Sequence, residues 1–594
     1  MSDSAHTRLW LAAGEWAERP AWADTFTREL PGDRAVGEAP YAAAERLGAE
    51  PDEDGAVAVA VPAARLRAPR TVRGALWSWA VPERQPAPRL VAVSAGGARL
   101  VGLEPGAFWR DARAAAEAWS GGRRVGASHP WAHCYGGHQF GVWADQLGDG
   151  RAVSLGEAVG PGGARWEVQL KGAGPTPYSR FADGYAVRRS SIREFLAAEH
   201  LAALRVPSSR SLTLVFTGRT VRREADELGA VVARLAPSWV RFGSFELPAA
   251  RRDLGLVRAL ADYVVRHHFA DVIAAGPDRY AGLLRAVVRR TAAMVARWQA
   301  VGFCHGVMNT DNMSVLGLTI DYGPFAFLDA YDPGFICNHS DPGGRYAFGE
   351  QPRVALWNLL RLAGPLAALM DEGAGPPSAE TVAAVQAILG EYGPAYRDEY
   401  AHVMRRKLGL FGAPRAGDVE AVVQPLLDLL AEARADYSHA LRALCDAPHA
   451  VAAAAAGDGG AAAERLAERI AQRSLGLGCD PGPWQRRLAA YLLDVYGPRL
   501  REDAASGQPL SASAAAAVGE RMRGENPRLV LRNWVAQDVI ERAAAGDEAW
   551  VGKALEALTT HAFADQLPAD LADAEKYAGP VPAWGEGLVC SCSS

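Results

Sequence analysis

A switch in hydrophobic periodicity near residue 248 sets the architecture that this chain can adopt. Between about 130 and 245, short β-rich runs alternate with glycine-rich turns and one helix that opens at Ser191; the runs are 151–155, 166–170, 211–217 and 230–235. From about 250 onward, apolar residues recur at helical spacing, as in 253–269, 279–302 and 353–370. This order predicts an α+β chain in which a small antiparallel sheet lobe precedes a larger helical lobe. Kinase-type transferases have this two-lobe plan, but unrelated folds share it.

The chain divides into four predicted segments. Residues 1–115 form an N-terminal extension that packs on the β-rich lobe and includes a strand at 90–93. Residues 116–248 form the β-rich N-lobe and residues 249–445 the helical C-lobe. Residues 446–594 form a helical C-terminal region with an Ala/Gly-rich linker-like stretch at 449–463 and a cysteine-bearing tail.

Composition excludes several function classes. With 63 Lys plus Arg against 68 Asp plus Glu, the net charge of −5 provides no basic field for nucleic-acid binding. The first residues lack the charged and apolar regions of a secretory signal, and no run of about 18 apolar residues predicts a membrane span. We therefore expect a cytoplasmic protein that binds neither nucleic acid nor membrane.

A strand lysine and a helix glutamate form the first candidate pair. Alternation in 166–171 places Glu167, Gln169 and Lys171 on the polar face of the strand. Glu194 follows about 20 residues later in the helix. Kinases orient the lysine that binds ATP phosphates with such a glutamate. The structural alternatives are a solvated lysine and a capping box, Ser191-x-x-Glu194, at the start of the helix.

Two glycine-containing turns are candidates for contact with a nucleotide. Gly148 and Gly150 flank Asp149 and precede Arg151, so bare backbone and a fixed positive charge would meet a phosphate or ribose. A β-hairpin turn explains the same pattern equally well. Asp183-Gly184 forms a second polar turn just before the helix.

Residues 302–329 bring three oxygen-bearing side chains into apolar surroundings. Asp311, Asn312 and Asp321 are the ligand types that Mg²⁺ prefers, and Mn²⁺ is the alternative metal. Asp321-Tyr322-Gly323 resembles the Asp-Phe-Gly of kinases, and Asn312 follows His305 by seven residues as in the kinase catalytic loop. Val307, however, occupies the position of the kinase catalytic aspartate.

Arg234 and Arg241 follow a β run where the sheet lobe meets the helical lobe. Their guanidinium groups match phosphate oxygens in a bidentate geometry, and with Lys171 they would neutralise a triphosphate. Surface salt bridges are the alternative explanation.

Seven cysteines are too few for a disulfide scaffold, and none forms a CxxC metal pair. Two of them, Cys590 and Cys592, lie in the tail VCSCSS. The tail is either an inert frayed end or a redox-active segment.

Together, five segments closely resemble the selenoprotein O family: 135–151, 169–196, 305–329, 331–341 and the terminal Cys-Ser-Ser. The resemblance is dense in the middle of the chain and loose over the first 115 residues. It implies a pseudokinase-like fold that binds ATP in an inverted orientation. It also implies transfer of AMP to Ser, Thr or Tyr hydroxyls of proteins, with release of pyrophosphate.

The resemblance also implies a role for each matching residue. Lys171, Arg234 and Arg241 would hold the distal phosphates, Glu194 would orient Lys171, and Asp311 would accept the proton. Asn312 and Asp321 match the metal ligands. The rest of the nucleotide site would comprise Gly148, Gly150, Arg151, Asp183 and Gly184. Cys592, third from the end, would pair with Cys337, although the additional Cys590 offers another route.

Two other activities remain as alternatives. A catalytically silent ATP-binding scaffold would explain the missing catalytic aspartate, but it need not keep both metal ligands. A small-molecule kinase would share the two-lobe plan but lacks the base.

Overall fold

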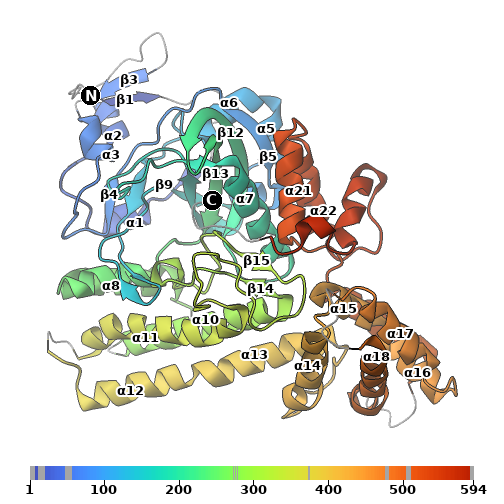
Figure 1. The fold of residues 1–594 in the computed structure, drawn as a ribbon. Coiled ribbons are helices and arrows are strands. Elements are labelled where there is room, and N and C mark those ends of the chain that lie inside the picture. The colour runs from blue at the N-terminus through green and yellow to red at the C-terminus, as the bar shows by residue number, and fades with distance from the viewer. Residues whose placement is uncertain are drawn as a thin grey trace.

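The computed structural model describes residues 7–10, 20–46, 56–59, 61–271, 273, 276, 278–371, 375–474, 480–503 and 510–588. A mixed α/β region with a large sheet comes first, and helices dominate after residue 241 (Figure 1). Within these residues, no helix combines the length and the apolar character needed to cross a membrane.

The central element is a nine-stranded antiparallel sheet. Its main path, in spatial order, is β4 (Trp77–Trp79), β6 (Trp131–His133), β9 (Ala152–Val159), β10 (Arg165–Lys171), β13 (Asp226–Ala236), β12 (Arg210–Arg222) and β5 (Arg89–Val93). β2 (Ala21–Trp22) pairs with β9, and β11 (Ala186–Val187) pairs with β13. The four predicted runs between 151 and 235 are all strands of this sheet, and the predicted antiparallel arrangement is confirmed.

Residues before 115 are part of this sheet. The predicted strand at 90–93 is confirmed as β5, which pairs with β12, and β4 pairs with β6. The smaller strands are β1 (Thr7–Trp10), β3 (Ala56–Val59), β7 (His138–Gln139), β8 (Val142–Trp143), β14 (Phe303–Cys304) and β15 (Ala326–Phe327).

Helices cover both faces of the sheet. The first seven are α1 (Thr25–Glu29), α2 (Pro40–Arg46), α3 (Ala63–Arg67), α4 (Ala95–Leu100), α5 (Pro105–Arg110), α6 (Ala112–Trp119) and α7 (Arg188–Ala203). Val168 and Leu170 of β10 pack with Phe108 and Trp119 of α5 and α6. On the opposite face, Phe195 of α7 packs with other sheet residues. Alternation along β10 therefore separates an apolar core face from the polar face that carries Lys171.

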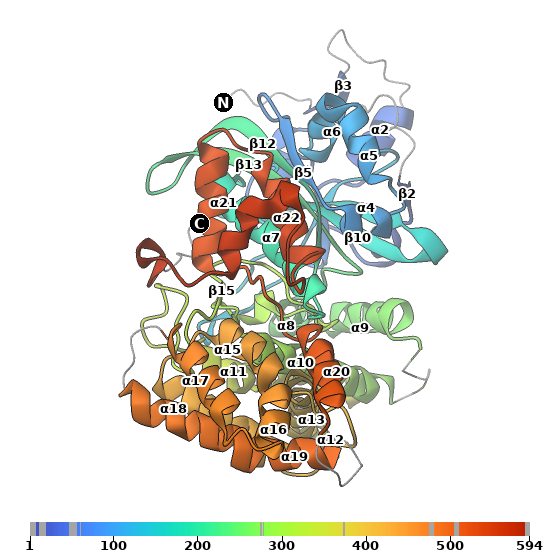
Figure 2. The ribbon, with the colours of Figure 1, turned by 90° about the vertical axis from the view of Figure 1, so that its right-hand side faces the viewer.

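The helices that follow α7, up to α20, lie below the sheet (Figures 1 and 2). They are α8 (Phe242–Ala250), α9 (Leu254–His268), α10 (Arg279–Val301), α11 (Gln351–Met370), α12 (Ala379–Gly390), α13 (Tyr392–Lys407), α14 (Gln424–Glu432), α15 (Tyr437–Ala443), α16 (Ala447–Ala455), α17 (Ala461–Ala471), α18 (Pro481–Ala490), α19 (Gly497–Asp503) and α20 (Ala512–Arg523). The helices predicted at 253–269, 279–302 and 353–370 are confirmed as α9, α10 and α11. The predicted linker at 449–463 is mostly helical, because alanine favours helix; the break covers only 456–460.

The C-terminal segment returns to the sheet. α21 (Asn533–Ala544) and α22 (Trp550–Thr559) lie beside α7, and their residues belong to the same hydrophobic core as the sheet (Figures 1 and 2). α14 to α20 instead share a separate core with α13. Arg532, just before α21, forms a buried bidentate ion pair with Asp436 at 2.7 and 2.9 Å, which links the two parts.

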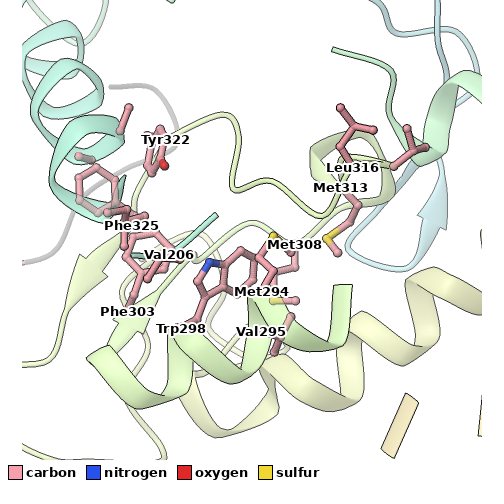
Figure 3. Packing of buried hydrophobic residues seen from close by; sticks show 14 of the residues in the cluster. Val206, Met294, Val295, Trp298, Phe303, Met308, Met313, Leu316, Tyr322 and Phe325 are labelled. Atoms are coloured by element: carbon pink, nitrogen blue, oxygen red, sulfur yellow. The ribbon is translucent and has the colours of Figure 1, made fainter. Parts of the chain in front are cut away.

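Figure 3 shows the apolar cluster that supports the segment 303–325. Trp298 of α10 lies beneath it, near Met308, and its indole nitrogen donates to Thr319 Oγ1 at 2.8 Å. Met308 and Met313 bracket residues 309–312, so the loop that carries Asp311 and Asn312 is anchored from both sides by buried thioethers.

Replacing Trp298 by Ala should lower the free energy of unfolding by about 3–5 kcal/mol, because it empties a large buried volume and removes a hydrogen bond. Chemical denaturation followed by circular dichroism measures the change. Trp109→Ala is the matched control, because Trp109 is 51% exposed; it should cost at most ~0.5 kcal/mol. Equal losses in both variants would contradict the assignment of Trp298 to the core.

Candidate active site

A cleft of about 770 Å³ separates the polar face of the sheet from the loop segment 307–324. Eleven of the predicted site residues line it: Gly148, Gly150, Arg151, Lys171, Asp183, Gly184, Arg234, Arg241, Asp311, Asn312 and Asp321. Glu194 lies one layer behind, against Lys171. Residues that are up to 173 positions apart in the sequence thus meet in one cavity.

Lys171 is the last residue of β10, and Glu194 lies on the helix that covers the sheet. Lys171 Nζ and Glu194 Oε2 are 2.5 Å apart, and both side chains are buried. Burial lowers the pKa of Lys171, and the Glu194 carboxylate opposes that shift. The alternative of a solvated lysine is therefore wrong.

The capping-box explanation of Glu194 is also wrong. α7 begins at Arg188, so Glu194 lies in its second turn, and Ser191 is inside the helix. The sequence rule failed because Val187 in β11 leads directly into the helix, which begins before the first Ser-x-x-Glu signal.

Arg234 and Arg241 converge on Asp321. Arg234 Nη1 is 2.7 Å from Asp321 Oδ1 and 2.8 Å from Glu194 Oε1. Arg241 forms a close ion pair with Asp321 Oδ2. Both guanidinium groups are buried, which excludes the surface salt-bridge alternative. Burial alone would raise the pKa of Asp321, but Arg241 and Arg234 hold that pKa well below its usual range.

Gln169 and Asp149 contact these arginines, although the sequence analysis did not identify either as a site residue. Gln169 Oε1 accepts from Arg234 Nη2 at 2.9 Å, and Gln169 Nε2 donates to Asp149 Oδ2 at 2.9 Å. Asp149 lies 3.6 Å from Arg241. The strand alternation that marked Lys171 also marked Gln169, and Asp149 stands between the two glycines, so both signals were present in the sequence.

Aromatic rings complete the arginine environment. The Arg234 guanidinium lies 4.2 Å from the ring centre of Trp239, and that of Arg241 lies 4.7 Å from Tyr135. Such cation–π contacts restrict the two guanidinium groups without neutralising them.

The glycines around Asp149 allow a close approach of the loop 176–179. Gly148 has φ 110°, and a Cβ there would lie 2.5 Å from the Tyr178 ring. Thr176 Oγ1 donates to the Asp149 carbonyl at 2.7 Å. The hairpin interpretation of this turn is wrong: β8 pairs only with β7 among the described strands, and β9 pairs with β6, β10 and β2.

Asp183 and Gly184 lie at the outer edge of the cleft. Asp183 accepts from Arg223 at 2.8 Å, and Gly184 has φ 80°. A Cβ on Gly184 would meet the Gly174–Pro175 peptide at 2.3 Å, so only glycine fits there.

Asp311 and Asn312 lie on a short 3-10 helix, Thr310–Asn312. Asp311 Oδ2 accepts from Gln139 at 3.3 Å, whereas Oδ1 is buried without a hydrogen-bond partner among the described residues. Burial raises the pKa of Asp311 to about 7, and Arg241 counteracts this. Asn312 donates its amide to the Val307 carbonyl at 3.0 Å.

The donor chemistry fits a hard divalent cation. Asn312 and Asp321 offer amide and carboxylate oxygens in one cleft, and the unpartnered Asp311 oxygen adds negative potential there. Each Asp321 oxygen already contacts an arginine. A metal ion that arrives with phosphates fits this site better than a metal ion alone, because the phosphates would bind those arginines.

Cys337 lies away from the cleft. Its Sγ is buried and 3.5 Å from Cys304 Sγ on β14. Cys590 and Cys592 lie outside the described residues, so the predicted pairing with Cys592 stays a prediction.

Known proteins resemble this chain over most of its length. A family model described as "Protein adenylyltransferase SelO" matches residues 81–559. A protein from Bordetella avium, named protein nucleotidyltransferase YdiU, is 44% identical over 510 residues, which cover 85% of this chain and 93% of the relative. A protein of the same name from Myxococcus xanthus is 43% identical over 513 residues, covering 86% of this chain and 95% of the relative. The chain therefore belongs to the SelO family of protein adenylyltransferases.

Proposed function

We propose that this chain is a protein adenylyltransferase with a protein-kinase-like two-lobe arrangement. It would transfer AMP from ATP to Ser, Thr or Tyr hydroxyls of proteins and release pyrophosphate. One observation carries the proposal: three buried cations and the Asp321 carboxylate meet in the same cleft as Asp311. Family membership supports the same reaction.

The cations select the outer phosphates of ATP. Lys171, Arg234 and Arg241 are buried and held by Glu194, Gln169 and Asp149, so they bind a polyanion without a large reorganisation cost. With the β- and γ-phosphates held there, the α-phosphate would face Asp311 and the acceptor. Arg151, Asp183 and Gly184 would contact the remainder of the nucleotide.

Transfer then exchanges one P–O bond for another. The acceptor oxygen bonds to the α-phosphorus, and the bond from that phosphorus to the bridging oxygen of the β-phosphate breaks, so pyrophosphate leaves. Asp311 would accept the hydroxyl proton. Asn312 and Asp321 would hold Mg²⁺ or Mn²⁺, which would supply neutralising charge to the phosphates when bound.

The position of the last described residues supports the proposed redox tail. Leu588 accepts a hydrogen bond from Asn533 at 2.8 Å, and Arg193 bridges Asn533 to the Phe325 carbonyl. Phe325 precedes β15, which pairs with the strand that carries Cys304, the neighbour of Cys337. Cys592 is four residue steps beyond Leu588, a reach of up to about 14 Å. We therefore propose that Cys592 pairs with Cys337.

Incubation with ATP labelled in the α-phosphate should label acceptor proteins, because AMP carries the α-phosphorus. ATP labelled in the γ-phosphate should leave them unlabelled, since that label departs with pyrophosphate. Gel autoradiography measures both. Labelling from the γ-phosphate alone would indicate a kinase, and ATP binding without either label would indicate a silent scaffold.

Asp321→Asn should lower the rate of AMP transfer at least ~100-fold, because it removes a charged metal ligand at the phosphates. The isosteric amide keeps an oxygen for one arginine, whereas alanine would remove every contact of this side chain with the two buried guanidinium groups. Asp226→Asn, on an exposed strand end, is the control and should keep full activity. A variant at Asp321 that folds and transfers AMP normally would refute the metal assignment.

Mass spectrometry of the oxidised protein, digested without reductant, should find a Cys337–Cys592 peptide. Cys304→Ser should leave that linkage intact, because the tail and not the neighbouring thiol is the proposed partner. A Cys304–Cys337 linkage in the unmodified chain would contradict the redox-tail proposal.

A further inference from the structure

The tight turn of the β7–β8 hairpin holds Phe140 in a backbone conformation that is unfavourable for a bulky residue. Phe140 has φ 50° and Gly141 has φ 86°, so both central residues lie in the left-handed region, as in a type I′ turn. Gly141 suits its position, since a Cβ there would touch the Arg345 guanidinium at 3.1 Å. Asn, Asp or Gly would normally occupy the position of Phe140.

Neighbouring groups hold Phe140 in this conformation. Its backbone N–H donates to Asn309 Oδ1 at 3.1 Å and to the Tyr346 hydroxyl at 3.0 Å. Its side chain nevertheless remains 40% exposed. A smaller residue would stabilise the same turn better, so an exposed aromatic residue held in this conformation by hydrogen bonds points to a role in binding another molecule.

The hairpin contacts Asp311, the proposed proton acceptor. Gln139 donates to Asp311 and is paired across the hairpin with Val142. Cross-strand partners share one face of a hairpin, so Val142 lies on the face of Gln139. Val142 is 71% exposed. Gly137 packs directly on Asp311, since a Cβ at Gly137 would lie 2.9 Å from Asp311 Oδ1.

Helix α11 meets the hairpin on its other face, because the Trp357 ring lies 5.5 Å from the ring of His138, which alternates with Gln139. Arg345 lies beside Gly141 and against Trp357, so it joins the tip of the hairpin to the helix. Leu356 and Leu360, four residues apart, share an exposed face of α11 next to Trp357. We call Phe140, Leu356, Trp357 and Leu360 the hairpin–α11 surface.

The border of this surface is positively charged. The guanidinium groups of Arg345 and Arg361 lie 4.8 and 4.9 Å from the Trp357 ring centre. Arg353 is exposed and forms an ion pair with Glu350 at 2.5 Å. Three arginines against one exposed carboxylate favour a partner with acidic residues.

We propose that the hairpin–α11 surface binds the acceptor protein through a segment with apolar residues flanked by acidic ones. This inference rests on the proposed AMP transfer, and it names the class of acceptor. Docking there would place a nearby hydroxyl beside Asp311, while the nucleotide occupies the cleft behind the hairpin. Exposed apolar side chains with a polar rim are the usual anatomy of such a surface.

The test compares three synthetic acceptor peptides with one tyrosine each. The first carries two leucines and flanking aspartates, the second has serines in place of the leucines, and the third has lysines in place of the aspartates. Transfer of AMP from α-labelled ATP and binding by fluorescence anisotropy are both measured. The first peptide should have a KM about tenfold lower than either of the others.

The double variant Leu356→Ser plus Leu360→Ser should raise the KM for the first peptide about tenfold and leave the KM for ATP unchanged. Both side chains are exposed, so the variant should fold. Val495→Ser removes an exposed apolar residue from the separate C-terminal helices and should change neither constant.

Equal KM values for the three peptides, or an unchanged peptide KM in the double variant, would overturn the docking inference. So would failure to bind the first peptide by an enzyme that labels other proteins. If the unmodified chain transfers AMP to no protein at all, the proposed function itself fails, and the two failures are thereby distinguished.

Discussion

The structure depends on how a group of buried charges is neutralised. Asp321 is bound by Arg234 and Arg241, and Lys171 by Glu194; the three cations and Glu194 are buried, whereas Asp321 is partly exposed to the cleft. Removing one member would leave a buried charge with fewer partners, which is a costly change in a protein. The strands β10 and β13, helix α7 and the loop after Ile320 therefore have to meet in one arrangement.

The same arrangement explains why the cleft suits a polyphosphate. The arginines are held in place, because Arg234 donates a hydrogen bond to Gln169, Arg241 forms an ion pair with Asp149, and an aromatic ring lies over each guanidinium group. In the proposed reaction, a ligand with several negative charges would replace the carboxylate contacts of the arginines and free Asp321 for a metal. Nucleotide binding and metal binding would thus be coupled through a single set of ion pairs.

Sequence reasoning succeeded where a local pattern carries the information. Alternation identified β10 and the polar face that holds Lys171 and Gln169, and helical spacing located α9, α10 and α11. It left two interpretations open at Glu194, where a capping signal competed with an ion pair to a distant strand, and at the turn of Gly148, where a hairpin competed with the close approach of another segment. In both cases a contact between remote segments decided the outcome.

Local patterns in the sequence specify the order of sheet and helices, the mixed fold class and, through the motifs, the family. The packing of distant segments is what returns α21 and α22 to α7, lets Arg234 and Arg241 share Asp321, and places the hairpin of Phe140 against Asp311. Periodicity reports which face of each element is apolar. It does not report which distant face will cover it, because that choice depends on shape and charge complementarity across the whole chain.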